Sequence, residues 1–254
     1  VGGGFGMKGG AFGEDILVLW GAKATGRPVK WVGDRLESFM SDSHGRDVIA
    51  DCEMAFDDDG KITGLRISAD YNVGAYLSPN AGVSPMFFSI LLSGVYAIPA
   101  IDVTTRCLFT NMGATAPYRG AGRPEAAYIL ERLLDIASRE LDIDPIEIRR
   151  RNLVKADQMP YQTALMPNLD CGDFEAVMDK ALEISDWQGF DARKAEASSR
   201  GKIRGRGVAV YMESAAPFNE RMEIRFDPGG DVTVIAGTHS HGQGHETAFA
   251  QLVT

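Results

Sequence analysis

The sequence predicts an α+β fold in which β-hairpins and helices occupy separate stretches of the chain. Two turn signals support the hairpins, Asp-Asp-Asp-Gly at residues 57–60 and Asp-Pro-Gly-Gly at residues 227–230. Each lies between two runs of alternating apolar and polar residues, as in a hairpin. Between them, residues 124–140 carry apolar side chains at helical spacing. We therefore expect packed helices beside hairpins, without a regular βα repeat.

The strands follow from short runs rich in β-branched and aromatic residues. We expect them at residues 29–32, 46–56, 61–71, 101–109, 207–212, 222–226 and 232–236. Residues 160–170 contain two prolines and mixed polarity, which indicates a loop. We place a domain boundary there, between a first domain at 1–160 and a second at 161–254.

Four helices are expected, and the clearest spans residues 124–140. Pro124 suits a first helical position, and Glu125 complements the positive end of the helix dipole. An earlier helix begins near Glu14 and Asp15 and ends at the Gly-Arg-Pro sequence that starts with Gly26. The other two helices are expected at residues 173–184 and 245–253.

The composition excludes several classes of protein. A net charge of −9 and a pI near 5.0 argue against a nucleic-acid surface, which needs clustered positive charge. The basic run at residues 200–206 is interrupted by glycines and reads as a solvated loop before a strand. The apolar stretch at 86–100 is shorter than the roughly 20 residues of a membrane helix. Three dispersed cysteines offer no iron–sulfur or zinc framework, and we expect reduced thiols in a cytoplasmic protein.

Three glycine-rich loops are the main functional signal. They read Val-Gly-Gly-Gly-Phe-Gly-Met-Lys at 1–8, Tyr-Arg-Gly-Ala-Gly-Arg at 118–123 and Gly-Gln-Gly-His-Glu-Thr at 242–247. Each leads into a predicted helix, whose first N–H groups and dipole favour anions. Glycine also lets a backbone approach a ligand closely. One such loop alone reads as a tight turn, whereas three suggest a pocket of backbone N–H groups for a large anionic group.

The first loop also allows a different interpretation. Residues 4–9 fit the Gly-x-Gly-x-x-Gly pattern, and a helix follows, as in an NAD(P)-dependent dehydrogenase. That alternative predicts a sheet of parallel strands. No preceding strand is visible, Glu14 and Asp15 would repel a pyrophosphate, and hairpins follow where βα units are required.

Polar side chains in the loops give further candidates. Arg119 either holds an anionic group, orders its loop, or forms a surface salt bridge. The Gln243 amide, between Gly242 and Gly244, can donate a hydrogen bond, and its small neighbours leave room for an acceptor. Three nearby histidines lack the His-Glu-x-x-His pattern and a clear further zinc ligand, and we expect loop roles for them: His239, His241 and His245.

Taken together, the order and spacing of the three loops resemble the large subunit of the molybdenum hydroxylases, the xanthine oxidase family. Residues 144–153, Asp-Pro-Ile-Glu-Ile-Arg-Arg-Arg-Asn-Leu, are similar to a segment found there after the second loop. The residues of the second loop most resemble those of the form II carbon monoxide dehydrogenase-like branch. The resemblance implies two molybdopterin-binding domains, mixing hairpins, sheets and helices. It also implies that the chain is an internal piece of a longer protein.

The resemblance assigns roles to loop residues. Phe5 and Gly6 are expected beside the molybdenum, Arg119 in the loop over the metal, and Gln243 against the oxo or dithiolene side of the pterin. Arg119 and Gln243 are the catalytic candidates, and no side chain is expected to bind the metal directly. The neighbouring cofactor-binding candidates are Gly4, Gly120, Ala121, Gly242 and Gly244. The family's catalytic glutamate and a second glutamine are expected outside residues 1–254, so we expect this chain alone to be inactive.

Two departures from relatives bear on the substrate. Carbon monoxide-oxidising enzymes carry a copper-ligating cysteine in the second loop, where Gly120 or Ala121 stands here. Xanthine dehydrogenases carry a glutamate where Gly9 stands and an aromatic ring where Ala121 stands. The resemblance therefore implies oxidative hydroxylation of an aldehyde or a (hetero)aromatic carbon, with water as the oxygen source.

The cofactor implied is molybdopterin with molybdenum, in the cytosine dinucleotide form for a bacterial enzyme. The family passes its electrons to [2Fe–2S] clusters and FAD, which we expect on partner subunits in a dimer of heterotrimers. A noncatalytic member that keeps the fold without the cofactor is the remaining alternative.

Overall fold

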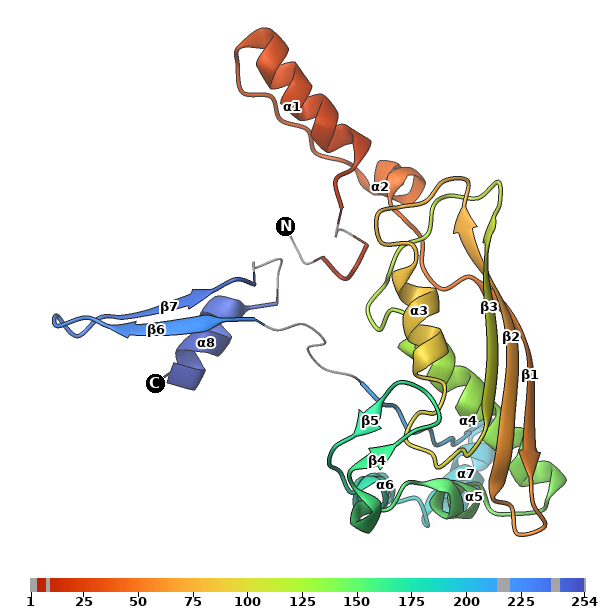
Figure 1. Ribbon diagram of the computed structural model, residues 1–254. Helices are drawn as coiled ribbons and strands as arrows, with labels where there is room; N and C mark the ends of the chain where they lie inside the picture. The colour runs from red at the N-terminus through yellow and green to blue at the C-terminus, as the bar shows by residue number, and fades with distance from the viewer. Residues whose placement is uncertain (1–3, 8–9, 214–219, 239–242, 254) are drawn as a thin grey trace. The chain divides into compact units, whose positions relative to one another are not determined.

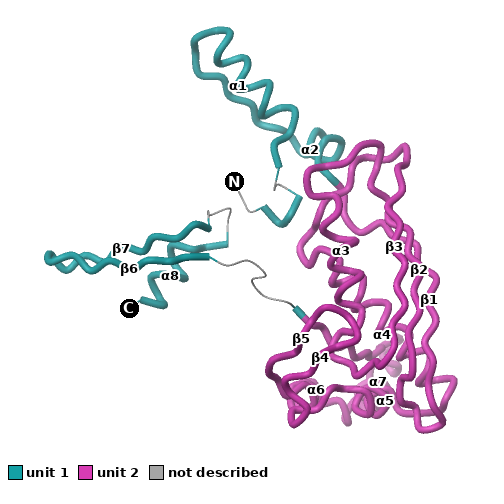
Figure 2. The backbone as a smooth tube through the Cα atoms, viewed as in Figure 1, with its two compact units in different colours: residues 1–43, 213–254 teal, residues 44–212 magenta. Residues whose placement is uncertain are grey.

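The chain is described here by a computed structural model, which covers residues 4–7, 10–213, 220–238 and 243–253 (Figure 1). It divides into two compact units (Figure 2). Unit 1 comprises residues 1–43 and 213–254, and unit 2 comprises residues 44–212. Each unit is described by itself. The predicted mixture of helices and strands is confirmed.

A three-stranded sheet forms the centre of unit 2, in the order β1 (Val48–Phe56), β2 (Ile62–Gly74) and β3 (Ile101–Phe109). The predicted hairpin is confirmed, because β1 and β2 are antiparallel. At its turn, Asp57 Oδ1 accepts from the Lys61 N–H at 2.8 Å. β3 runs parallel to β2, so the sheet is mixed, unlike the parallel sheet that the dehydrogenase alternative predicts.

Helices cover one face of this sheet. Figure 1 shows α3 (Val83–Ile90) and α4 (Arg123–Glu140) on the same side of the strands. Ile67, Ala69 and Tyr71 of β2 are buried in one core with Phe88 of α3 and Leu134 of α4. The opposite face carries ion pairs such as Arg66–Glu53 at 2.8 Å and Arg106–Asp70 at 2.5 Å. This division is the alternation expected of a sheet with one solvated face.

A buried ion-pair network fixes α4 to α5 (Pro145–Asn152). The Arg149 side chain is 0% exposed, and its Nε lies 2.8 Å from Glu131 Oε2. Its Nη2 lies 2.9 Å from Asp135 Oδ1, and the Tyr96 hydroxyl donates to Glu131 Oε1 at 2.5 Å. Burial disfavours the charge, yet these carboxylates hold the pKa of Arg149 above its usual value. The network satisfies a guanidinium that is completely removed from water.

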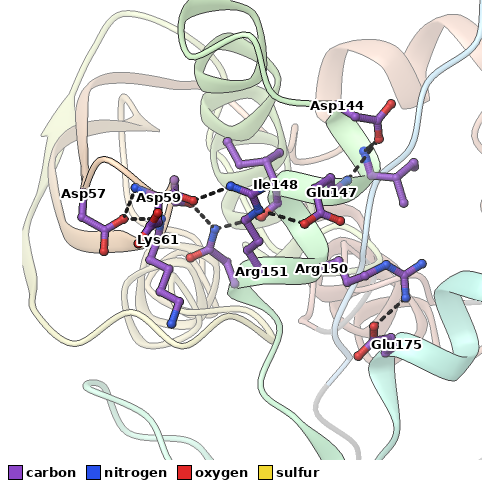
Figure 3. Close-up of polar contacts among 12 residues, drawn as sticks. Asp57, Asp59, Lys61, Asp144, Glu147, Ile148, Arg150, Arg151 and Glu175 are labelled. Carbon is purple, nitrogen blue, oxygen red and sulfur yellow. Dashed lines mark hydrogen bonds and ion pairs between the residues drawn. The ribbon is translucent and has the colours of Figure 1, made fainter.

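The helix α5 also holds the β1–β2 turn. Figure 3 shows Arg151 between the turn and its own helix, donating to the Asp59 carbonyl at 2.6 Å and to Glu147 Oε1 at 2.8 Å. Asn152 is buried, and its Oδ1 accepts from the Ile62 N–H at 2.8 Å. The segment singled out in the sequence at 144–153 therefore ties the hairpin to the helices.

The remainder of unit 2 contains smaller elements. They are the 3-10 helix η1 (Ala156–Gln158), strands β4 (Tyr161–Gln162) and β5 (Asn168–Leu169), and helices α6 (Phe174–Ile184) and α7 (Phe190–Ser199). The helix predicted at 173–184 is confirmed, and Asp173 caps it by accepting from the Ala176 N–H at 2.9 Å. Arg150 joins α5 to α6 through Glu175 at 2.6 Å (Figure 3). The loop predicted at 160–170 contains a short hairpin, formed by β4 and β5 with two residues each. The helix α7 was not predicted.

Two predicted strands are wrong. Residues 207–212 are extended, and Val208, Val210 and Met212 pack partly buried against the core, but no strand pairs with them in the described part of the chain. Residues 29–32 are likewise unpaired, and Val32 is exposed. The side chains at 207–212 alternate between partly buried and exposed, as in a strand, but a strand also needs a neighbour for its backbone hydrogen bonds.

Unit 1 comprises two stretches of chain. The first contains α1 (Gly13–Thr25) and α2 (Arg35–Ser41), and the second contains β6 (Met222–Phe226), β7 (Val232–Ala236) and α8 (His245–Val253). The predicted first helix, the second hairpin and the last helix are confirmed. The unpredicted α2 begins at a reciprocal cap, in which Asp34 and Glu37 accept each other's N–H at 2.8 Å. Among the described residues, we find no helix with the length and apolar character to cross a bilayer.

We predict that Arg149→Met lowers the free energy of unfolding by about 3–5 kcal/mol, because it leaves Glu131 buried without its cation. Denaturant titration monitored by circular dichroism would measure the loss. Lys180→Met is the matched control, since Lys180 and Glu183 form an exposed pair, and it should cost less than about 1 kcal/mol. Equal effects of the two substitutions would contradict a dominant role for the buried network.

Candidate functional site

The second glycine loop leads directly into α4 and has an unusual backbone. Gly120, Ala121 and Gly122 have φ angles of 104°, 45° and 93°. A left-handed conformation costs a residue with a side chain roughly 1–2 kcal/mol, so Ala121 is strained. Two hydrogen bonds hold the turn, from the Ala121 N–H to the Tyr118 carbonyl at 2.6 Å and from the Arg123 N–H to the Gly120 carbonyl at 3.1 Å.

Glycine is required where this loop meets α3. A Cβ atom on Gly122 would lie 2.7 Å from the Phe88 nitrogen and closer still to the Ser84 carbonyl oxygen. A Cβ on Gly120 would lie 2.7 Å from Pro124 Cδ. The loop therefore takes its shape from contact with α3 and with the first turn of α4.

The loop offers backbone donors at a helix N-terminus. In the residues that the structure describes, the N–H groups of Gly120 and Gly122 donate to no acceptor. The helix that follows has 18 residues, so its dipole is fully developed. Unpaired N–H groups in this position fit an anionic or oxo-bearing group. The sequence predicted such backbone donors at this helix N-terminus, and their use by a cofactor stays a prediction.

The two arginines of the loop differ in environment. The Arg119 side chain is exposed, and it forms no ion pair or hydrogen bond with another described residue. Arg123 is buried, its guanidinium carbon lies 4.2 Å from the centre of the Phe87 ring, and its Nη1 donates to the Gly120 carbonyl at 3.2 Å. Arg123 thus supports the loop from within, whereas Arg119 is available to a ligand. The surface salt bridge considered for Arg119 is not formed among these residues.

A third arginine, which the sequence analysis missed, supports the loop from outside. Arg46 Nη2 donates to the Arg119 carbonyl, and its guanidinium carbon lies 5.0 Å from the centre of the Tyr118 ring. Arg46 is separated from Arg119 by 73 positions, and no local motif surrounds it. Its own φ of 59° is the only backbone sign of a special position, and a sequence does not display it.

The first loop is described at residues 4–7, and its remaining residues, including Lys8 and Gly9, lie outside the described part. Phe5 and Gly6 have φ angles of 53° and 93° in a turn, and Phe5 is 48% exposed. At the start of α1, Asp15 Oδ2 accepts from the Phe12 N–H at 3.0 Å. The helix thus supplies its own anion at this N-terminus, which argues against a pyrophosphate there.

The third loop is described from Gln243 onward, so Gly242, His239 and His241 lie outside the described residues. Gln243 is exposed, and Gly244, with a φ of 80°, accepts the first hydrogen bond of α8 from Ala248 at 3.0 Å. The His245 ring is stacked on Phe249 at 4.9 Å. Within the part of the chain described, no three His, Cys, Asp or Glu residues are grouped as a metal site would need.

The structure assigns the first and third loops to unit 1 and the second to unit 2. The described residues of each loop include positive φ angles, as expected from its glycines. The assignment of Phe5, Gly6, Arg119 and Gln243 to one cofactor site stays a prediction.

The fold and these loops agree with comparisons to known proteins. Family models for the molybdopterin cofactor-binding domain match residues 1–153 and 180–254. The chain therefore belongs to the molybdopterin-binding domains of the xanthine oxidase family, as the three loops indicated.

Three similar proteins illustrate the relationship. The gamma subunit of the 6-hydroxypseudooxynicotine dehydrogenase complex of Paenarthrobacter nicotinovorans is 34% identical over 100% of this chain and 33% of its own. The carbon monoxide dehydrogenase large chain of Hydrogenophaga pseudoflava is 32% identical, over 100% and 34%. The crystal structure of quinoline 2-oxidoreductase from Pseudomonas putida 86 matches with a TM-score of 0.88 and 34% identity, over 99% and 34%. The chain thus spans about a third of the length of these molybdenum oxidoreductases.

We predict that Gly122→Ala destabilises unit 2 by about 2–6 kcal/mol, because it adds backbone strain and a clash with α3. Gly201→Ala is the matched control. Gly201 also has a positive φ, 69°, but no atom lies within 4 Å of a Cβ placed there. That substitution should cost only about 1–2 kcal/mol. Denaturant titration of both variants separates strain from packing, and equal losses would refute the packing argument.

Proposed function

We propose that this chain supplies part of the molybdopterin site of a molybdenum hydroxylase. The observation that carries the proposal is the backbone of the second loop, where three successive residues with positive φ leave the N–H groups of Gly120 and Gly122 without acceptors. These N–H groups and the exposed Arg119 fit an anionic, oxo-bearing group. The proposal rests also on membership of the molybdopterin-binding family.

The residues have distinct proposed roles. The loop from Arg119 to Gly122 orients the oxo or phosphate groups through backbone and guanidinium donors. Phe5 presents an exposed ring that excludes water, and the Gly6 N–H beside it donates to an oxo group. Gln243 donates its amide from the third loop. When bound, the cofactor supplies the redox chemistry of hydroxylation, and these residues supply position and electrostatics.

The substrate proposed is an aldehyde or a (hetero)aromatic ring that is hydroxylated at carbon with oxygen from water. Quinoline, which the name of one similar structure contains, is a nitrogen heterocycle. Ala121 brings only a methyl group to the second loop, so this position provides neither a thiol for copper nor a ring to stack on a purine. These absences argue against carbon monoxide and xanthine as substrates.

The wider assembly is also a proposal. The sequence has three dispersed cysteines and no cluster motif, so the [2Fe–2S] clusters that receive the electrons would lie on other domains or subunits. FAD is proposed there as well. We propose that the assembly is a dimer of heterotrimers and that the cofactor is the cytosine dinucleotide form of molybdopterin. We also propose that this chain divides into two domains near residue 160.

We predict about one molybdenum atom per large chain in the full-length protein, purified with its partner subunits. Plasma mass spectrometry measures the metal, and release of the pterin by acid identifies its nucleotide. A related hydroxylase expressed in the same host is the control for cofactor supply. A chain without molybdenum in a host that loads the control would favour the noncatalytic alternative.

We further predict that the loaded enzyme oxidises quinoline or benzaldehyde, and not xanthine or carbon monoxide. The second loop lacks the groups that the last two substrates require. Dye reduction with each of the four compounds gives the rates, and reaction in H₂¹⁸O tests the oxygen source. Incorporation of ¹⁸O from water into the product supports hydroxylation, whereas label from O₂ would refute it.

A further inference from the structure

A pocket of about 320 Å³ lies in unit 2 between the edge strand β1 and the first half of α4. Its walls are mostly apolar and are provided by Val48, Ala50, Pro124 and Ile129. Tyr128, 71% exposed, adds an aromatic ring, and Glu125 adds a carboxylate. Small-molecule sites commonly combine such apolar walls with a few polar groups, and this volume is at the small end of their range.

Glu125 is the unusual member of this lining. Glu125 is only 8% exposed, and its carboxylate forms no ion pair or hydrogen bond with any described residue. One carboxylate oxygen, Oε2, is completely buried and lacks a partner, whereas Oε1 is not completely buried and is the oxygen that a ligand in the pocket would reach. A carboxylate withdrawn from water without a partner is unfavourable. Its place in the first turn of α4 offsets only part of that cost, because the helix dipole is a weak counter-charge.

A second unpartnered polar atom lies at the same interface of helix and sheet. The Tyr71 hydroxyl of β2 is buried without a hydrogen bond, and Tyr71 is paired in the sheet with Val48 of the pocket wall. Burial, together with the charge of Glu125, holds the pKa of Tyr71 far above its usual range. Tyr71 therefore remains a neutral phenol and does not neutralise the carboxylate.

The cation in the lining of this pocket is already engaged elsewhere. Arg46 lies at the pocket, but its guanidinium donates to the Arg119 carbonyl and faces the Tyr118 ring, and it forms no ion pair with Glu125. The pocket thus offers an uncompensated carboxylate, an aromatic face and aliphatic walls. A protonated amine satisfies the first two through an ion pair and a cation–π contact, and an attached apolar group fills the rest.

We infer that this pocket binds a small organic ammonium ion with an apolar ring or chain, with Glu125 as its counter-ion. The pocket is lined by residues of β1 and α4 and by Arg46, none of which belongs to a glycine loop, and its proposed ligand does not require the molybdenum cofactor. It is connected to the second loop through Arg46, which contacts both.

Benzylammonium is the probe, titrated calorimetrically into the full-length protein with its partner subunits. We expect saturable binding that Glu125→Gln weakens about 10–100-fold, the range expected for loss of a charged hydrogen-bonding partner. Glu140→Gln, which removes the same charge from the exposed end of α4, should bind the probe as the unmodified protein does. Benzoate has the same ring with the opposite charge and should not bind.

A second variant tests the pocket independently, in case Glu125→Gln does not fold. Ala50→Leu adds apolar volume to the pocket wall without touching the carboxylate, and it should abolish binding of benzylammonium. The inference is overturned by equal binding to Glu125→Gln and the unmodified protein, by unchanged binding to Ala50→Leu, or by the absence of saturable binding. Molybdenum content is measured in the same samples, so loss of the cofactor and loss of the amine site are distinguishable.

Discussion

The buried guanidinium of Arg149 is the interaction on which the rest of unit 2 depends. A fully desolvated cation is tolerated only where carboxylates and carbonyls surround it, and here Glu131 and Asp135 of α4 provide them. This requirement fixes how α5 lies along α4. The first turn of α4 contains Glu125 and directly follows the second glycine loop, so a network farther along the helix, from Glu131 to Asp135, holds the element that presents both.

The same rigidity explains how the second loop keeps a strained backbone. Gly120 and Gly122 adopt their positive φ angles without strain, whereas that of Ala121 persists because the surrounding structure determines it, and this loop is held on both sides. Arg123 supports it from the α3 side through Phe87, and Arg46 holds the Arg119 carbonyl from outside. Both supports come from residues of unit 2, so the fold around the loop determines its backbone shape.

Local signals in the sequence were sufficient for both hairpins, for β3 and for the long helix α4, since turn residues and helical spacing act over a few positions. The strand at 207–212 failed because pairing depends on distant chain. The helix α2 was not predicted, although Asp34 and Glu37 have the sequence spacing of a capping box. At the candidate site, the glycine loops were visible in the sequence, whereas Arg46 was not, because a contact over 73 positions leaves no local pattern.

Electrostatics at the site depend on short-range groups. The chain carries a net charge of −9, and that overall field opposes an anionic cofactor. At physiological ionic strength such a field is screened over about 8 Å, whereas N–H groups in contact with a ligand are not. In the proposed site, the loop would attract an anion through backbone donors and one exposed arginine, against the negative net charge of the chain. This arrangement makes specificity a property of loop geometry, which is why the glycines that set the φ angles of the loop matter more than the total charge of the chain.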